Sequence, residues 1–378
     1  MPPRVLFYVQ HLLGIGHVQR SLRIAEALVA REIAVTLVQG GPPAPDLARA
    51  NGIDVVQVPP IHARDATFAL IDATGAPVGD ALRAERRAAL LATFAIARPD
   101  AVVIEGFPFA RRAFRFELDP LIAATREAHV PVICSVRDIP TVRGDPDRLA
   151  EIVRRVREDF AAVLVHGDAS FIPFDVAFPA APEIADRLRY TGYVATPSAP
   201  GAEAEDGYGN ILVSVGGGAA GRALVTAALA ARREGCCAER GWRILAGSSH
   251  SEEELGELRR NLPPCVIVER FRRDFPSLLQ HCHLSLSQAG YNTVLDILTA
   301  RVRAVLVPFT AERETEQLIR AEHLAARGTA VILCETELSP AALATAIERA
   351  AASEPQYPKI NIDGARRAAA MIAEIIGA

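Results

Sequence analysis

A glycine turn that ends in a histidine is the first feature of the chain that could do chemistry. Gly14, Gly16 and His17 (GIGH) lie between an apolar, β-prone run, RVLFYV, and a helical pattern, HVQRSLRIAEALVARE. Glycine permits backbone conformations and close approaches that other residues avoid. Histidine titrates near neutral pH and can exchange a proton with a bound group. The turn therefore predicts either a proton-transfer residue at a ligand site or a histidine that caps or packs the helix.

A second glycine turn opens the second half of the chain. Gly216, Gly217 and Gly218 follow the apolar run ILVSV, and a helix is expected to begin near Ala220. The free N–H groups and partial positive charge of a helix start suit a phosphate. No Gly-Lys-Ser/Thr follows, and no acidic residue stands at the distance typical of a dinucleotide site, so two common phosphate motifs are excluded. Phosphate binding and simple packing of strand against helix both remain open.

A third turn follows the run LSLS. Ser287 and Gly290 end the strand, and Asn292 or Thr293 is expected to start a helix. Asp296 stands one turn into that helix. Its carboxylate could reach ligand hydroxyls, or it could simply complement the helix dipole.

Charge gathers after the next apolar strand, VPF. The segment TAERETEQ is dense in charge for a turn directly after a buried strand, and it contains Glu312, Glu314, Glu316 and Gln317. These side chains suit a polyhydroxy ligand. The alternative is an ordinary solvated helix start with acids in its first turn.

The elements that must position these turns alternate along the chain. Apolar strand-like runs are followed by longer helical patterns in both halves, which predicts parallel sheets covered by helices. The segment 196–208 is rich in Pro, Gly, Ala and acid and is expected to be a linker. We therefore expect one α/β domain over residues 1–195 and another over 209–357. A C-terminal helix, about 358–378, is expected to cross back onto the first.

Composition narrows the class of protein. The chain has 378 residues, half of them hydrophobic, and a formal net charge of −4. That length favours two domains, and the slightly acidic balance gives no general attraction to nucleic acid. Six cysteines without metal-ligand spacing are expected to be reduced thiols of a cytoplasmic protein. We expect no signal peptide and no membrane span, because no apolar run approaches about 20 residues.

Two short segments invite a metal interpretation, and we favour another one for each. In GDPDR, Asp145 or Asp147 precedes a helix and is expected to cap it. In QHCHL, the alternation predicts His281 and His283 on one face of a short element. No metal site is expected.

The three turns, in this order and followed by VPF and EQ, resemble the GT-B glycosyltransferases, most closely the MurG-like group. The resemblance is strongest over residues 210–333. It implies an α/β fold of two Rossmann-like, doubly wound parallel-sheet domains that face each other across a cleft. It also implies a nucleotide-sugar donor on the second domain and an acceptor on the first.

The resemblance assigns roles to individual residues. Gly216–Gly218 would hold the nucleotide diphosphate, and Asp296 the ribose hydroxyls. Glu316 and Gln317 would read the donor sugar. The backbone of Gly14 and Gly16 would approach the ligands. The remaining nucleotide-site residues would be Phe271 and Arg272 beside the base, with Ser287, Gly290, Tyr291, Asn292 and Thr293 lining the site.

The chain departs from the family pattern at several of these positions. Asp296 stands where the family usually has a glutamate, and Glu316 where it usually has an amide or an aspartate. GIGH lacks the doubled glycine of the lipid II enzyme, and the loop from Phe309 to Gln317 is one residue longer. We expect a uridine nucleotide and leave the sugar open.

On the acceptor side, the resemblance implies that His17 takes a proton from the attacking hydroxyl, with Arg20, Arg111 and Arg112 nearby. The segment GFPFARRAFRFELDPL (106–121) interleaves four phenylalanines with three arginines. Such a surface could meet a lipid phosphate or an anionic bilayer. The alternative buries the phenylalanines in the core beneath outward-facing arginines.

Together these features predict an inverting, metal-independent glycosyltransferase that needs no cofactor besides its nucleotide-sugar donor. Its acceptor would be a hydroxyl compound, lipid-linked or phosphorylated among the options. The location would be cytoplasmic, with peripheral contact at the inner face of a membrane left open. The turn GIGHVQR also resembles that of a UDP-sugar hydrolase of pseudaminic acid synthesis, in which the histidine would activate water. A non-catalytic nucleotide-sugar-binding protein is the third alternative.

Overall fold

The computed structural model describes residues 2–12, 16–44, 52–64, 69–140, 145–195, 208–216, 220–247, 250–272, 274–310 and 315–378. The chain forms two compact units. Unit 1 comprises Met1–Ala195 and Ile360–Ala378, and unit 2 comprises Thr196–Lys359.

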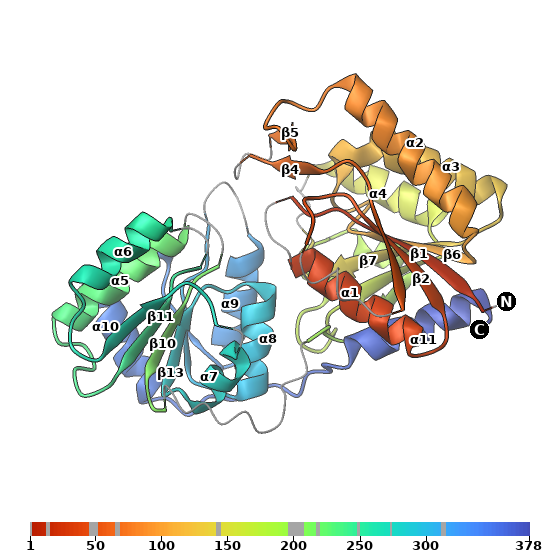
Figure 1. The fold of residues 1–378 in the computed structure, drawn as a ribbon. Helices are drawn as coiled ribbons and strands as arrows, with labels where there is room; N and C mark the ends of the chain where they lie inside the picture. Colours follow the sequence, from red (N-terminus) through yellow and green to blue (C-terminus); the bar gives the residue numbers. More distant parts are fainter. Residues whose placement is uncertain are drawn as a thin grey trace. The chain divides into compact units, whose positions relative to one another are not determined.

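Unit 1 is built on a seven-stranded parallel sheet in the order β3-β2-β1-β6-β7-β8-β9 (Figure 1). Its strands are rich in Val, Ile and Leu because helices cover both faces. A small antiparallel pair, β4 (Ile61–Ala63) and β5 (Leu70–Asp72), lies outside this sheet. The seven strands are β1 (Arg4–Val9), β2 (Ala34–Gln39), β3 (Ile53–Gln57), β6 (Ala101–Glu105), β7 (Val132–Arg137), β8 (Ala162–His166) and β9 (Leu188–Tyr190).

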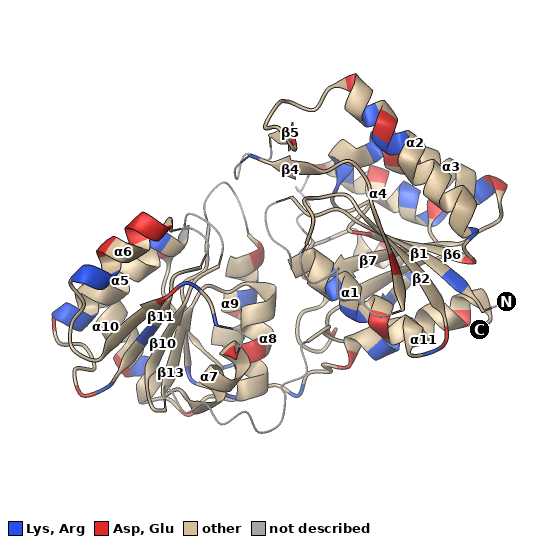
Figure 2. Ribbon diagram, in the orientation of Figure 1, with Lys and Arg blue, Asp and Glu red and all other residues tan. Residues whose placement is uncertain are grey.

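Two sets of helices cover the unit 1 sheet. On one face, α2 (Asp80–Ala97), α3 (Arg115–Glu127) and α4 (Pro146–Asp159) bury their apolar sides against the strands. On the other face lie α1 (Gly16–Val29) and α11 (Gly364–Ile376), which pack side by side (Figure 1). Basic and acidic residues stand close together on α2 (Figure 2).

The C-terminal helix joins unit 1 through a tight backbone contact. The Tyr193 N–H donates to the Asn361 carbonyl at 2.7 Å, which starts the return of the chain. Gly364, the first residue of α11, lies against the same segment. A Cβ there would meet the Gly192 carbonyl oxygen at 2.4 Å, so only glycine fits. Four α11 residues then enter the apolar core beneath α1: Ala368, Ala369, Ile372 and Ala373.

Unit 2 repeats the plan with a six-stranded parallel sheet, order β12-β11-β10-β13-β14-β15. The strands are β10 (Ile211–Ser214), β11 (Trp242–Leu245), β12 (Val266–Glu269), β13 (Leu284–Ser287), β14 (Ala304–Leu306) and β15 (Val331–Ile332). One apolar core joins this sheet to three helices, α5 (Ala220–Arg233), α6 (Glu252–Arg260) and α10 (Pro340–Ala351). The other helices are α7 (Phe275–His281), α8 (Tyr291–Ala300) and α9 (Glu316–Ala326).

The predicted fold class is confirmed, since both units are doubly wound parallel sheets. The expected cap is also present: the Asp145 carboxylate accepts a hydrogen bond from the Asp147 N–H at the start of α4. Among the described residues, no group of three or more His, Cys, Asp or Glu side chains could hold a metal ion. No described helix is both long and apolar enough to span a membrane.

The aromatic segment of unit 1 is not a free surface. Phe107, Phe109 and Phe114 are at most 2% exposed and belong to the core between the sheet and α2–α4. The interpretation that these rings meet a bilayer is therefore wrong. Phe116, the fourth ring of the segment, is partly buried against the same core, while the neighbouring arginines keep part of their surface exposed.

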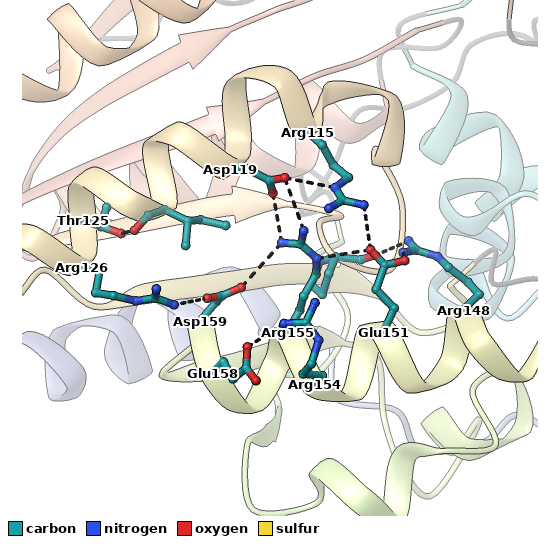
Figure 3. A network of polar contacts seen from close by, with 12 residues as sticks. Arg115, Asp119, Thr125, Arg126, Arg148, Glu151, Arg154, Arg155, Glu158 and Asp159 are labelled. Atoms are coloured by element: carbon teal, nitrogen blue, oxygen red, sulfur yellow. Dashed lines mark hydrogen bonds and ion pairs between the residues drawn. The ribbon is translucent and has the colours of Figure 1, made fainter.

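An ion-pair network joins α3 to α4 on the outside of this core (Figure 3). Arg155 of α4 contacts Asp119 of α3, and Arg115 of α3 contacts Glu151 of α4. Arg148, in the first turn of α4, pairs with Glu151 at 2.9 Å. Its guanidinium also donates to the Pro108 carbonyl at 2.6 Å. The network therefore ties α4 to the loop that follows β6.

Candidate active site

A buried carboxylate marks the carboxyl end of β6. Glu105 is the last residue of that strand and is 1% exposed. It lies in register with Ser135 on β7 and on the same face of β6 as the apolar Ala101 and Val103. An ionised carboxylate is costly to bury unless charged or hydrogen-bonding partners compensate it.

Two side chains of α1 supply those partners. His17 Nδ1 lies 2.7 Å from Glu105 Oε1, and Arg20 Nη2 donates to the same oxygen at 2.5 Å. Residues three apart lie on one side of a helix, so the first turn of α1 presents both to the strand end. The His17 side chain keeps 24% of its surface exposed. The helix start thus holds an imidazole with one nitrogen against a buried acid.

The surroundings keep His17 neutral and Glu105 ionised. Burial lowers the pKa of His17 to about 4, reinforced by the positive charges of Arg137 and Arg111 and opposed by Glu105. Burial alone would raise the pKa of Glu105, but His17, Arg20 and Arg111 hold that pKa well below its ordinary value. A neutral imidazole beside a carboxylate donates its Nδ1–H, which leaves Nε2 to accept a proton.

The acceptor-side arginines predicted from the sequence divide into two groups. Arg20 and Arg111 both reach Glu105, Arg111 Nη2 lying 3.8 Å from Glu105 Oε2. Arg112 is exposed in the short 3₁₀ turn 112–114 and contacts none of these groups in the described interactions. The structure therefore does not bring Arg112 together with the other two.

A chain of buried hydroxyls supports this edge of the sheet. His166, at the end of β8, lies 2.7 Å from Ser135 Oγ through Nε2 and 2.9 Å from Thr191 Oγ1 through Nδ1. Burial lowers the pKa of His166 to about 3. The imidazole is fully buried and hydrogen-bonded on both sides, so its role is structural.

The carboxyl ends of the unit 2 strands surround a cavity of about 170 Å³. Three residues predicted from the sequence line it, namely Phe271, Arg272 and Thr293. Phe271 is 71% exposed, which is unusual for a phenylalanine and leaves its ring available to a ligand. The Arg272 guanidinium donates two hydrogen bonds to the Asp274 carboxylate, from Nε at 2.8 Å and from Nη2 at 2.7 Å. The remaining lining residues are Ser214, Val215, Leu245, Gly247, Arg270 and Phe275.

Other predicted nucleotide-site residues lie around the start of α8. Ser287 ends β13 in register with Ser214 of β10, and neither hydroxyl has a hydrogen-bond partner among the described residues. Gly290 is the N-cap of α8, and Tyr291 packs its ring 5.7 Å below the guanidinium of Arg320. Asn292 and Asp296 are partly exposed on the same helix.

Glu316 and Gln317 brace the strand ends. Glu316 is 6% exposed and pairs with Arg320 at 2.8 Å. Gln317 Oε1 accepts from the backbone N–H groups of Ala289 and Phe309 at 3.2 and 3.1 Å. The acid is therefore engaged within unit 2, and the amide oxygen spans two loops at the ends of β13 and β14.

The remaining predicted glycines are only partly placed. Gly16 is the first residue of α1, and the Gly216 N–H donates to Gln288 Oε1 at 3.0 Å. Gly14, Gly217 and Gly218 lie outside the described residues, as do Glu312 and Glu314.

Sequence reasoning missed Glu105 and Arg137. Each is a charged residue at the very end of an apolar strand, in VVIEG and CSVRD. That position is a usable signal, because the carboxyl ends of parallel strands gather functional side chains.

Comparisons with known proteins agree with this architecture. Residues 211–375 match the glycosyltransferase family 28 C-terminal domain. The UDP-N-acetylglucosamine--N-acetylmuramyl-(pentapeptide) pyrophosphoryl-undecaprenol N-acetylglucosamine transferase of Prochlorococcus marinus (strain MIT 9303) is 31% identical over 164 residues, 40% of this chain and 43% of the relative. The enzyme of the same name from Bacillus pumilus (strain SAFR-032) is 27% identical over 152 residues, 39% and 42% of the two chains. The match spans about two fifths of the length of these relatives.

Solved structures cover the whole chain. The calicheamicin glycosyltransferase CalG4 aligns with a TM-score of 0.66 at 20% identity, over 100% of this chain and 98% of its own. MurG of Acinetobacter baumannii aligns with a TM-score of 0.61 at 18% identity, over 100% and 99%. The chain therefore has the fold of the GT-B glycosyltransferases, and its residues 211–375 carry a C-terminal domain of the family 28 type.

Proposed function

We propose that the protein is an inverting glycosyltransferase that moves a sugar from a UDP-sugar to a hydroxyl acceptor, without a metal ion in the reaction. The observation that carries the proposal is His17, held neutral at a helix start with Nδ1 on the buried carboxylate of Glu105. Support for the donor comes from the family 28 match of residues 211–375 and from relatives whose names specify a UDP-sugar.

The proposed step uses groups of this chain in defined roles. His17 Nε2 takes the proton of the acceptor hydroxyl as its oxygen attacks the anomeric carbon, and the bond to the UDP oxygen breaks. Glu105 fixes the tautomer and stabilises the imidazolium that forms. Attack from the face opposite the leaving group inverts the anomeric configuration. UDP departs as an anion, which the glycine turn at 216–218 and the helix start after it would stabilise.

On the donor side, the cavity of unit 2 is the proposed base pocket. Phe271 and Thr293 line it, and Asp296 would hold the ribose hydroxyls. Gln317 would face the donor sugar through its amide nitrogen, whereas Glu316 would act through Arg320. The acceptor would bind on unit 1, near Arg20 and Arg111.

The test measures UDP release from a panel of UDP-sugars in the presence of EDTA, with and without hydroxyl acceptors. We expect release that depends on an acceptor, a product of inverted anomeric configuration by NMR, and a loss of about 100-fold or more in His17→Ala. His129→Ala, which replaces an exposed histidine of the same unit, is the control. UDP affinity should fall in Asp296→Ala and stay unchanged in His17→Ala.

The other outcomes each contradict a part of the proposal. Release of free sugar without any acceptor would identify a UDP-sugar hydrolase in which His17 activates water. Binding of UDP without turnover on any acceptor would indicate a non-catalytic binding protein. If no nucleotide binds, the assignment of the unit 2 cavity is wrong.

A further inference from the structure

Arg111 is a nearly buried cation whose guanidinium has no hydrogen-bond partner among the residues that the structure describes. Its side chain is 11% exposed, and its guanidinium makes no hydrogen bond to any described residue. Its nearest charged partner is Glu105 Oε2, at 3.8 Å, which is beyond hydrogen-bond distance. Buried guanidinium groups are normally hydrogen-bonded, because removing five donors from water without replacement is costly. Among the described residues, the Arg111 guanidinium therefore has an ion-pair partner in Glu105 but no hydrogen-bond partner.

The carboxylate of Glu105, beside Arg111, also has one oxygen without a hydrogen bond among the described residues. Glu105 Oε1 accepts from Arg20 and lies 2.7 Å from His17 Nδ1, whereas its buried Oε2 has no hydrogen-bond partner in the part of the chain that the structure describes. His17 and Arg111 thus lie at opposite oxygens of one carboxylate. A group bound by Arg111 would lie close to the hydroxyl that His17 deprotonates.

Charged side chains of both signs act on Arg111. Among the described residues, the strongest effects on its pKa come from Glu105 and from the two cations Arg137 and Arg20. Burial lowers the pKa of Arg111, and both cations lower it further. Tyr8 also lies near, but burial raises its pKa well above the ordinary value, so it is a neutral phenol. An anion bound at Arg111 would therefore also be attracted by the positive charges of Arg137 and Arg20.

The backbone holds Arg111 in place. Arg111 has a φ of 63°, which is uncommon for a residue with a side chain, and it follows Gly106 at a φ of 80°. Such conformations persist where the surrounding structure fixes them, and they gather at ligand sites. The Pro108 carbonyl between these residues accepts a hydrogen bond from Arg148. The guanidinium is thus presented by a braced loop.

We propose that Arg111 is the centre of an anion-binding subsite on unit 1 that takes a carboxylate or phosphate of the acceptor. The acceptor would be a hydroxy acid or a phosphorylated polyol whose anionic group lies a few bonds from the reacting hydroxyl. This inference rests on the proposed function and narrows the class of its acceptor. The planar fork of arginine suits the paired oxygens of either anion.

The test compares matched small probes by calorimetry on the full chain. The probes are glycerol, glycerate, glycerol 3-phosphate and inorganic phosphate. They are titrated into the wild type, Arg111→Gln, Arg111→Lys and Arg154→Gln. The last variant removes one positive charge from an exposed pair on α4 and controls for net charge. We expect the three anions to bind and glycerol not to bind. Affinity should fall about tenfold or more in Arg111→Gln, fall less in Arg111→Lys, and stay unchanged in Arg154→Gln.

Three outcomes would overturn the proposal. Equal anion affinity in Arg111→Gln and the wild type would show that the anions bind elsewhere. Loss of UDP affinity in Arg111→Gln would assign the anion to the donor diphosphate. Equal turnover of neutral and anionic acceptors by the wild type would show that the enzyme does not select acceptors by a carboxylate or phosphate group. Arg111→Lys keeps the charge, so it tests the site even if Arg111→Gln fails to fold by circular dichroism.

UDP binding by the wild type keeps this test separate from the proposed function. If UDP and UDP-sugars do not bind while phosphate still requires Arg111, the anion subsite exists and the glycosyl-transfer proposal fails. If UDP-sugars turn over while phosphate and glycerate do not bind, the glycosyl-transfer proposal stands and the anion-subsite proposal fails.

Discussion

Glu105 determines which nitrogen of His17 is free to accept a proton. Its ionised Oε1 faces Nδ1, and a carboxylate can only accept, so the imidazole must donate from that side. Glu105→Gln keeps the shape but offers an amide that can donate or accept. We expect kcat to fall about 100-fold or more, because the base loses its tautomer and the imidazolium its counter-charge. Steady-state UDP release measures this, with UDP affinity unchanged.

The matched control for that variant is Glu127→Gln. This acid is exposed at the C-terminal end of α3. The same amide substitution there should leave kcat within about twofold of the wild type. An active Glu105→Gln enzyme would mean that the carboxylate serves only to compensate Arg20 and Arg111.

The pH dependence of the reaction reports the charge state of His17. A base works when neutral, so activity should be present above its pKa and be lost as pH falls through it. With the pKa of His17 at about 4, the acid limb of kcat/KM should lie near pH 4 rather than near the ordinary value of 6.5. Arg137→Gln removes one of the positive charges that lower this pKa, so the limb should move to higher pH. A wild-type limb near 6.5 would contradict the buried environment described for His17.

At the scale of elements, α4 holds the loop that presents Arg111. Arg148 donates to the Pro108 carbonyl and pairs with Glu151, which is shared with Arg115 (Figure 3). Arg148→Ala removes the brace without touching Glu105 or Arg111. We expect the KM for the acceptor to rise about fivefold, with kcat little changed, because one hydrogen bond contributes about 1 kcal/mol. Initial-rate kinetics with varied acceptor separate the two constants.

Arg154→Ala on the same helix is the comparison for Arg148→Ala. Arg154 pairs with Glu158 one turn away, and both side chains are more than half exposed. Such surface pairs contribute little to stability, so its kinetics should match the wild type. Arg148→Lys, which can reach the carbonyl but lacks the second donor, should restore part of the acceptor affinity. Equal KM values in Arg148→Ala and Arg154→Ala would exclude a positioning role for Arg148.

The elements themselves were largely predictable, and the polar cluster was not. Buried parallel strands are continuous apolar runs, and glycine turns mark where helices begin, so both sheets follow from RVLFYV, ILVSV and their counterparts. Which charged side chains meet depends on strand order. Glu105 lies next to Ser135 only because β6 pairs with β7, and it reaches α1 only because β1 lies on the other side of β6. One sequence by itself does not show which strands are neighbours in the sheet.

The aromatic segment and the start of α9 show the same limit. From the sequence, Phe107 and Arg111 could both belong to an exposed surface. The structure places Phe107 in the apolar core and Arg111 beside Glu105. The sequence predicts Glu316 at the donor sugar, and in the structure its carboxylate pairs with Arg320, one helical turn later. The spacing of four residues is compatible with an ion pair on a helix, but the sequence analysis did not predict this one.

For the whole molecule, the discontinuity of unit 1 makes a prediction about unfolding. Unit 1 takes part of its core from α11, which follows unit 2 in the chain. Ile372 of α11 is fully buried in the core beneath α1. Ile372→Ala should lower the free energy of unfolding of unit 1 by about 2–5 kcal/mol, through lost apolar contact and the cavity left behind. Ile362→Ala, at a position 45% exposed, should change it little.

The two units can be followed separately because the chain has one tryptophan. Trp242 lies in β11, is 1% exposed and belongs to the core of unit 2. In a urea titration, Trp242 fluorescence therefore reports unit 2, while far-UV circular dichroism reports helices of both units. We expect Ile372→Ala to move part of the dichroism transition to lower urea and to leave the fluorescence midpoint in place. A shared shift of both signals would contradict this expectation and would mean that the two units unfold as one cooperative body.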